Sequence, residues 1–396
     1  MKQFAYLMML IFLFFTLSVL SCKNSVSSST QKINSVQNID DFNITLIKTN
    51  KGPGSVEIGD FNKDGLKDLA YATEDRSVAI LLGDGKGKFS PANGSPFFCN
   101  QYPNDIAIAD INKDGIPDLA IANTEVSMLT VLLGNGKGQF QQALQSPFKV
   151  HSKPHTHGVA IADFNSDGNL DLATDNWAHD QVLIIFGDGK GNFSNETFYK
   201  VGKRPYQRLR SADVNKDGRP DLITTNLEGN NSTVLLGDGD GKFIEAQGSP
   251  FAAGDAPFGL AIGDINGDRN DDLLIADSPT ITAESKGNDG LWILIGYGKG
   301  NFKTMKGSPF KTGKSPSRLA VGDLNNNGIN DVVVTNYNDK SISIFYMTKT
   351  GIDKIQTIKV GNRPDGIAIG DLNGDGKNDI TLTNYDDNTL MILFHK

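Results

Sequence analysis

The nonamer Asp60-Phe-Asn-Lys-Asp-Gly-Leu-Lys-Asp68 recurs six more times along the chain with the same pattern of Asp, Asn and Gly residues. The later copies begin at Asp110, Asp163, Asp213, Asp264, Asp323 and Asp371, at intervals of 48 to 59 residues. A repeat of this length is one supersecondary unit that cannot bury its apolar face alone. Seven such units are therefore expected to stack on one another.

Each copy carries oxygen ligands at positions 1, 3, 5 and 9, and a main-chain carbonyl is available at position 7. In the first copy these positions are Asp60, Asn62, Asp64, Asp68 and Leu66. A set of six to eight oxygens suits Ca²⁺, whereas Mg²⁺ keeps several waters and rarely uses an all-protein cage. The pattern predicts up to seven calcium sites.

The predicted ligands of the other six copies have the same spacing. They are Asp110, Asn112, Asp114, Ile116, Asp118; Asp163, Asn165, Asp167, Asn169, Asp171; Asp213, Asn215, Asp217, Arg219, Asp221; Asp264, Asn266, Asp268, Asn270, Asp272; Asp323, Asn325, Asn327, Ile329, Asp331; and Asp371, Asn373, Asp375, Lys377, Asp379. Arg269 replaces the turn glycine of the fifth copy, and Asn327 replaces the position-5 carboxylate of the sixth. Loops 264–272 and 323–331 are therefore expected to bind calcium most weakly.

Two alternatives compete with the calcium interpretation. An EF-hand opens with the same pattern but needs an acidic residue at position 12. Position 12 here is Tyr71, Ile121, Thr174, Thr224, Ile275, Val334 and Leu382, so the EF-hand is excluded. A solvated turn without metal is the alternative for any single copy, but seven copies at one spacing favour calcium.

The residues around each loop read as short strands. In the second unit, apolar runs at 105–109, 119–122 and 129–133 are separated by polar turns, and a fourth extended piece runs from 140 toward 148. Four-stranded antiparallel units repeated radially form a β-propeller. We therefore predict an all-β, seven-bladed propeller over residues 41–396. The last unit stops at its third strand, so we expect residues 42–49 to supply its outer strand and close the ring.

The amino end has a different composition. Residues 1–22 combine Lys2 with an apolar run and predict a secretory signal. Val19-Leu20-Ser21-Cys22 resembles a bacterial lipobox, which implies lipidation of Cys22, with an ordinary signal peptide or membrane anchor as the alternative. The serine-rich segment 23–40 predicts a flexible tether. We expect an exported lipoprotein at the outer membrane or cell surface, with secretion as the alternative.

The repeated Asp-x-Asn-x-Asp-Gly-x-x-Asp motif resembles the FG-GAP/VCBS repeat family over nearly all of residues 42–396. This family includes the seven-bladed propellers of integrin α-subunit heads and many bacterial secreted proteins. The resemblance implies calcium in the loops and frequent roles in adhesion or carbohydrate contact. It implies no single activity.

A candidate ligand site lies on the face opposite the predicted calcium loops, in the third and fourth units. The residues proposed for it are His155, His157, Trp177, His179, Arg204 and Arg208, with His151 and Tyr206 nearby. Aromatic rings can stack on a sugar, arginines can hold carboxylates, and histidines can act as bases or metal ligands. Exposed polar loops without a ligand are the plainer interpretation.

The predicted function is a binding, adhesion or scaffolding module for a carbohydrate or protein ligand. The alternative is a carbohydrate-active enzyme of the lyase or hydrolase type, although no known catalytic motif is visible. The formal net charge is −8, and 20 of the 46 acidic residues are predicted ligands of the repeated loops. We expect no nucleic-acid partner, membrane contact only through the amino-terminal lipid, and a monomer.

Overall fold

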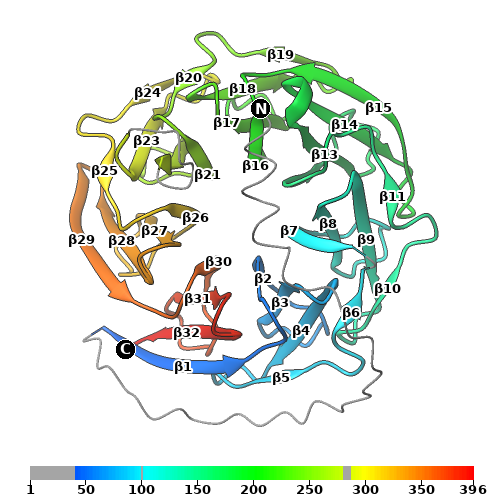
Figure 1. Ribbon diagram of the computed structural model, residues 1–396, viewed down its shortest axis with the longest axis vertical. Coiled ribbons are helices and arrows are strands. Elements are labelled where there is room, and N and C mark those ends of the chain that lie inside the picture. Colours follow the sequence, from blue (N-terminus) through cyan, green and yellow to red (C-terminus); the bar gives the residue numbers. More distant parts are fainter. Residues whose placement is uncertain (1–40, 100, 280–286) are drawn as a thin grey trace, which may run out of the picture. The chain divides into compact units, whose positions relative to one another are not determined.

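The computed structural model describes residues 41–99, 101–279 and 287–396. The predicted signal segment, Cys22 and the tether 23–40 lie outside these residues. The described residues form seven antiparallel sheets arranged as blades in a ring (Figure 1). The all-β seven-bladed propeller is therefore confirmed. No helix among the described residues is long and apolar enough to span a membrane.

Each blade runs from an inner strand at the centre of the ring to an outer strand at its edge (Figure 1). The first strands are β2 (Val56–Gly59), β7 (Tyr102–Ala109), β12 (Val159–Ala162), β16 (Pro205–Ala212), β21 (Pro257–Gly263), β26 (Pro316–Gly322) and β30 (Pro364–Gly370). The second strands are β3 (Asp68–Thr73), β8 (Asp118–Thr124), β13 (Asp171–Asn176), β17 (Asp221–Asn226), β22 (Asp272–Asp277), β27 (Asp331–Asn336) and β31 (Asp379–Asn384).

The third strands are β4 (Ser77–Gly83), β9 (Met128–Gly134), β14 (Gln181–Gly187), β18 (Asn231–Gly237), β23 (Gly290–Gly296), β28 (Ser341–Thr348) and β32 (Thr389–His395). The outer strands are β5 (Phe89–Pro91), β10 (Phe140–Gln142), β15 (Phe193–Lys200), β19 (Phe243–Glu245), β24 (Phe302–Thr304), β29 (Gly351–Lys359) and β1 (Phe42–Lys48). A short 3₁₀ helix, η1 (Trp177–His179), follows β13.

The ring closes as the sequence predicts. Strand β1 pairs antiparallel with β32, from Phe42 opposite His395 to Lys48 opposite Thr389. The last blade therefore takes three strands from the carboxyl end and its outer strand from residues 42–48. This pairing covers an edge of β32 that would otherwise be exposed.

Four outer strands differ from the single extended piece that the sequence suggests. In blades 1, 2, 4 and 5 the strand breaks after three residues, and a second short strand pairs with the start of the third strand: β6 (Phe97–Phe98), β11 (Phe148–Lys149), β20 (Phe251–Ala252) and β25 (Phe310–Lys311). A Ser-Pro-Phe sequence makes each break. In blade 2, the Ser146 hydroxyl accepts a hydrogen bond from the Val131 N–H at 2.8 Å, which satisfies a donor that the broken strand leaves open.

The core lies between adjacent blades. The second strands are almost wholly buried, because a neighbouring blade covers each of their faces. One such cluster joins Ala120 and Leu129 of blade 2 to Leu172 and Leu183 of blade 3. Burial on both faces explains why these strands show no alternation of buried and exposed positions, even where threonine or asparagine occurs.

Candidate functional site

The seven repeated loops connect the first strand of each blade to its second strand, as predicted. In the first loop, Asp60 accepts hydrogen bonds from the N–H groups of Asp64 at 3.1 Å and Gly65 at 2.9 Å. Asn62 Oδ1 also accepts from the Asp64 N–H at 3.0 Å, and Asp64 Oδ1 accepts from the Leu66 N–H at 2.8 Å. These bonds fold the oxygens of positions 1, 3 and 5 around one exposed turn.

The ninth-position aspartate has a second task that the sequence pattern does not reveal. Asp68 is fully buried, and its two oxygens accept main-chain hydrogen bonds from Phe61 and Gly83, both at 2.8 Å. The equivalent bonds recur in all seven blades. This carboxylate therefore ties the loop to the end of the third strand. Desolvation raises its pKa to about 6 in six blades, at Asp118, Asp171, Asp221, Asp272, Asp331 and Asp379.

The donor set fits calcium when all its oxygens are counted. Among the described residues, no set of three or more His, Cys, Asp and Glu side chains is arranged to hold a metal ion. The position-3 amide oxygen and the position-7 carbonyl would therefore have to contribute in each loop. A carboxylate has about four lone-pair sites, so the ninth-position aspartate can accept its two N–H bonds and still contact a cation.

Three loops depart from the common geometry. Arg269 of the fifth loop has φ +69°, a backbone conformation that is unfavourable for a residue with a Cβ. Asn327 donates from its amide nitrogen to the Met347 carbonyl at 2.9 Å. In the fourth loop, Arg219 donates to Asp217 at 2.6 Å, and this hydrogen bond lowers the pKa of Asp217. The sequence did not single out the fourth loop.

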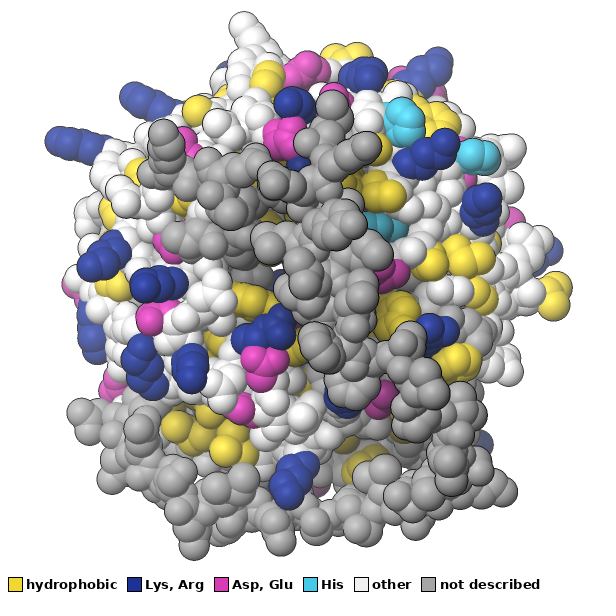
Figure 2. Space-filling model, viewed as in Figure 1, with side chains coloured by type: hydrophobic (Ala, Val, Ile, Leu, Met, Phe, Trp, Pro, Cys, Tyr) yellow, Lys and Arg dark blue, Asp and Glu magenta, His cyan; other side chains and the backbone are white. Residues whose placement is uncertain are grey.

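On the opposite face, four of the predicted ligand residues come together with Tyr206 at the junction of blades 3 and 4. We call this group, His155, His157, Trp177, Arg204 and Tyr206, the histidine cluster. The His157 ring centroid lies 4.5 Å from that of His155, 6.0 Å from that of Trp177 and 4.1 Å from that of Tyr206. Figure 2 shows histidine side chains in this sector among Lys, Arg and hydrophobic side chains.

The two histidines form a chain of polar contacts with Asp175 of β13. His157 is buried, and its Nδ1 lies 2.9 Å from Asp175 Oδ2. Its Nε2 lies 3.0 Å from Nε2 of the partly exposed His155. Burial, followed by the neighbouring His157, lowers the pKa of His155 to about 4. His155 is therefore neutral at pH 7. Asp175 orients the ring of His157, which in turn contacts His155.

Trp177 and Arg204 form the outer part of the cluster. The Arg204 guanidinium carbon lies 4.3 Å from the Trp177 ring centroid, and Glu228 makes an ion pair with the same guanidinium. Glu228 also pairs with Lys203 at 2.9 Å. The cluster thus offers partly exposed aromatic, imidazole and cationic groups side by side.

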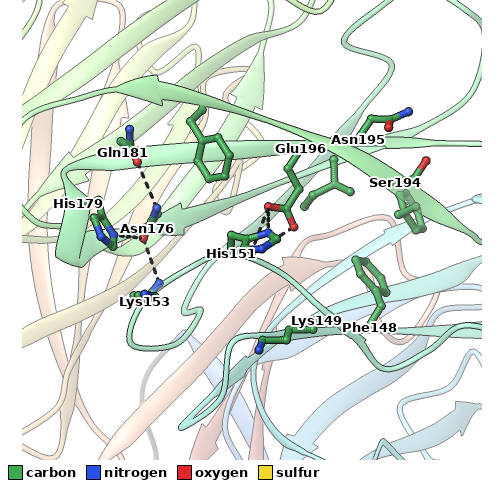
Figure 3. A pocket seen from close by; sticks show the side chains of 13 residues that line it. Phe148, Lys149, His151, Lys153, Asn176, His179, Gln181, Ser194, Asn195 and Glu196 are labelled. Atoms are coloured by element: carbon green, nitrogen blue, oxygen red, sulfur yellow. Dashed lines mark hydrogen bonds and ion pairs between the residues drawn. The ribbon is translucent and has the colours of Figure 1, made fainter.

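Other predicted site residues lie elsewhere. His179 and His151 line an open groove of about 780 Å³ between blades 2 and 3, where Phe148 stacks on Phe193 (Figure 3). His151 Nδ1 lies 2.8 Å from Glu196, and His179 Nδ1 lies 3.0 Å from Asn176 (Figure 3). Arg208 is buried at the centre of the ring, 3.3 Å from Asp105.

Asp175 is the participant that the sequence interpretation missed. The equivalent position in the other second strands is Ala72, Ala122, Thr225, Ala276, Thr335 or Thr383. An aspartate within a strand of buried residues is a signal of a specific polar partner, since buried charges require one. Comparison of the repeats position by position could therefore have found it.

Comparison with solved structures supports the fold. The crystal structure of BBS1N in complex with ARL6DN is similar over 88% of this chain and 93% of that one, with 12% identity and a TM-score of 0.58. A functionally unknown protein from Desulfotomaculum acetoxidans is similar over 78% of this chain and 89% of its own, with 9% identity and a TM-score of 0.54. A protein from Lactobacillus plantarum, 15% identical, has a TM-score of 0.55, with 78% and 86% of the two chains covered.

No curated protein matches the sequence. The model of the FG-GAP-like repeat matches residues 60–121, 110–174, 213–275 and 323–382, which together make up more than half of the chain. The matched segments each begin at the first aspartate of a repeated loop. The chain therefore belongs to the FG-GAP-like repeat family.

Proposed function

We propose that this protein is an exported binding module, stabilised by calcium, whose histidine cluster contacts a carbohydrate ligand. The observation that carries the proposal is the Trp177–Arg204 stack beside the His155–His157 pair. Aromatic faces provide apolar area for a sugar ring, and cationic groups beside them favour a sugar that bears a carboxylate. Loops on a rigid scaffold are a usual location for binding residues.

The calcium loops serve the same function indirectly. They lie at the end of the blades away from the histidine cluster, so calcium would stiffen the scaffold without contacting the ligand. The predicted lipidation of Cys22 would hold the module at a membrane surface, with the tether 23–40 between the lipid and the ring. Incorporation of labelled palmitate that is lost in Cys22→Ser would support the anchor.

The test is a glycan array probed with protein lacking residues 1–22, with calcium and again with EDTA. Binding to acidic glycans is expected with calcium. It should weaken about tenfold or more in Arg204→Gln, because a desolvated charge-assisted contact is lost. A protein ligand would give a blank array together with capture of a specific partner that Arg204→Gln does not capture.

Arg363→Gln is the matched control. Arg363 follows Gly-x in its blade link as Arg204 does, has φ +52° against +58°, and lies 4.8 Å from the Tyr337 ring centroid. No histidine pair accompanies it. Equal loss of binding in both variants would contradict a ligand site at the histidine cluster.

One observation favours catalysis as a second candidate. The contact chain from Asp175 through His157 to His155 orients a neutral imidazole, and this is the arrangement of a general base. A carbohydrate-active enzyme would lose turnover in His155→Ala while retaining part of its ligand affinity. A binding module would change in affinity alone.

A further inference from the structure

A separate cavity lies at the centre of the ring. It has a volume of about 300 Å³ and is lined by residues of the first strands of six blades. Five of its lining residues are ionisable: Glu57, Asp105, Arg208, Arg210 and Arg318.

These charged residues break the pattern of the repeats. Counting back three residues from the first loop aspartate reaches alanine in five blades, Ala107, Ala160, Ala261, Ala320 and Ala368. In the other two blades the residue is Glu57 or Arg210. The residue five positions before the first loop aspartate is Asp105, Arg208 or Arg318 in three blades, and glycine or serine in the other four. Alternate residues of a strand share a face, so both positions face the centre of the ring. The charged residues therefore replace small residues at positions that line the centre of the ring.

Asp105 lies at the middle of the network. Its Oδ1 is 3.3 Å from Arg208 Nη1 and 3.3 Å from Arg318 Nη1, and its Oδ2 is 3.0 Å from Arg210 Nη1. Asp105, Arg208 and Arg318 are all buried. Three guanidinium groups therefore converge on one carboxylate in a confined polar space.

Arg210 is the arginine that faces the cavity. Its side chain is 34% exposed, against 2% for Arg208 and 8% for Arg318. It donates from Nη1 to Asp105 and to the Leu209 carbonyl. Within the described structure, its Nε and Nη2 donate to no protein group, so one edge of the guanidinium fork is available. That edge matches the geometry of an oxyanion.

The local charge also favours an anion. Asp365, 2.9 Å from Arg318 Nε, is the third carboxylate of the network. Desolvation, opposed by Arg210 and Arg318 and reinforced by Asp105, raises the pKa of Glu57 to about 7. When Glu57 is protonated, three arginines face two carboxylates, and one positive charge remains uncompensated. Glu57 carries its proton below pH 7, so the excess positive charge is largest there.

We infer that the central cavity binds a small tetrahedral oxyanion, held by the outer edge of Arg210 and favoured by the uncompensated charge of the arginine network. This site is independent of the histidine cluster.

Sulfate is the probe, because it does not titrate between pH 5 and 9 and stays soluble with millimolar calcium. Titration calorimetry at constant ionic strength, with chloride as the replaced ion, should show one sulfate bound per chain at pH 6. Binding should weaken roughly tenfold by pH 8.5, as Glu57 ionises and cancels the excess charge. Binding that is absent at both pH values would overturn the inference.

Three variants assign the site. Arg210→Gln should lose sulfate binding, and Glu57→Gln should keep it while removing its pH dependence. Arg204→Gln, in the histidine cluster, should bind sulfate as the unmodified protein does, so this experiment is separate from the test of the proposed function. If Arg210→Gln fails to fold, Glu57→Gln still tests the inference, because its sulfate affinity should not change with pH. A sulfate affinity that Glu57→Gln leaves pH-dependent would contradict the site.

Discussion

Arg219 holds the carboxylate of Asp217 by an ion pair of 2.6 Å inside the fourth loop. Asp217 is the predicted position-5 oxygen ligand of that loop, and the other repeats have no arginine at position 7. A cation entering the loop must therefore displace or tolerate a guanidinium already bound to one of its ligands. We therefore expect the fourth loop, like the fifth and sixth, to bind calcium weakly.

Replacement of this arginine should strengthen calcium binding. In Arg219→Ile, which copies Ile116 of the second loop, Asp217 is released and one like charge is removed from the loop. We expect a gain in calcium affinity at this loop, because the guanidinium that occupies a predicted ligand and its positive charge are both removed. Calorimetric titration of the full chain would resolve it, with Lys377→Ile of the seventh loop as the comparison. No change in Arg219→Ile would contradict the competition.

Calcium removal should destabilise the whole ring. Extracellular-type calcium sites have dissociation constants of about 10⁻⁴ to 10⁻³ M, so 10 mM calcium would stabilise the fold by roughly 1.4 kcal/mol or more per occupied loop. The melting temperature measured by calorimetry should fall on addition of EDTA and recover with calcium. Magnesium serves as the control ion. An EDTA-insensitive melting temperature would contradict calcium as a stabiliser of the blades.

The ninth-position aspartates should matter even without calcium. Asp171→Ala removes both main-chain bonds of 2.9 Å and leaves one buried and one partly buried N–H group unsatisfied, so we expect a loss of about 3 kcal/mol in EDTA. Asp167→Ala, an exposed position of the same loop, should cost less than about 1 kcal/mol under the same conditions. Urea denaturation measures both. Equal effects would show that the buried bonds do not hold the loop.

Arg269 should be a site where glycine stabilises. Its φ of +69° costs a residue with a Cβ roughly 1 kcal/mol, and Arg269→Gly should recover that amount. Gly218→Ala in the fourth loop is the reverse test, because its φ is +82° and no atom within 4 Å would meet the added Cβ. Thermal unfolding in EDTA separates this backbone effect from metal binding. A lower melting temperature for Arg269→Gly would be inconsistent with strain.

The histidine cluster should make the fold sensitive to acid. The pKa of His155 is lowered from 6.5 to about 4 by desolvation, followed by His157. The unfolded chain therefore takes up a proton more readily than the folded chain between these values. The stability contributed by neutral His155 is complete above pH 6.5 and is lost as pH falls toward 4. Urea midpoints at pH 7.5 and 4.5 should differ less in His155→Gln than in the unmodified protein.

The sequence was sufficient to predict the architecture. The number of repeats predicts the number of blades, and the truncated last unit predicts how the ring closes. Residues 42–48 could be assigned to the last blade since that unit lacked a fourth strand. The broken outer strands were not predicted, although Ser146-Pro-Phe recurs in equivalent places. A two-residue strand held by a serine hydroxyl has too few residues to leave a periodic pattern.

The candidate site was predictable only in part. His155, His157, Trp177 and Arg204 lie in links and turns of adjacent blades, so topology alone brings them together. Arg208 is close in sequence to Arg204, so the sequence placed it in the same site. It lies on β16 two residues before Arg210, and the alternation of side chains along this strand directs it to the centre of the ring. The sequence of a single repeat cannot show this, because the partner, Asp105, comes from a blade that is not its neighbour.

The pairing of β1 with β32 also bears on how the chain folds. It joins segments that are almost the whole described chain apart, so it carries the largest loop-closure entropy of any strand pair in the ring. Contacts between such distant segments form late, and they slow folding. Strand β1 therefore remains unpaired until β32 has been made, after the strands of the other six blades. After β1 and β32 have paired, we expect unfolding to be slow as well, because this pairing leaves no terminal blade that can detach by itself.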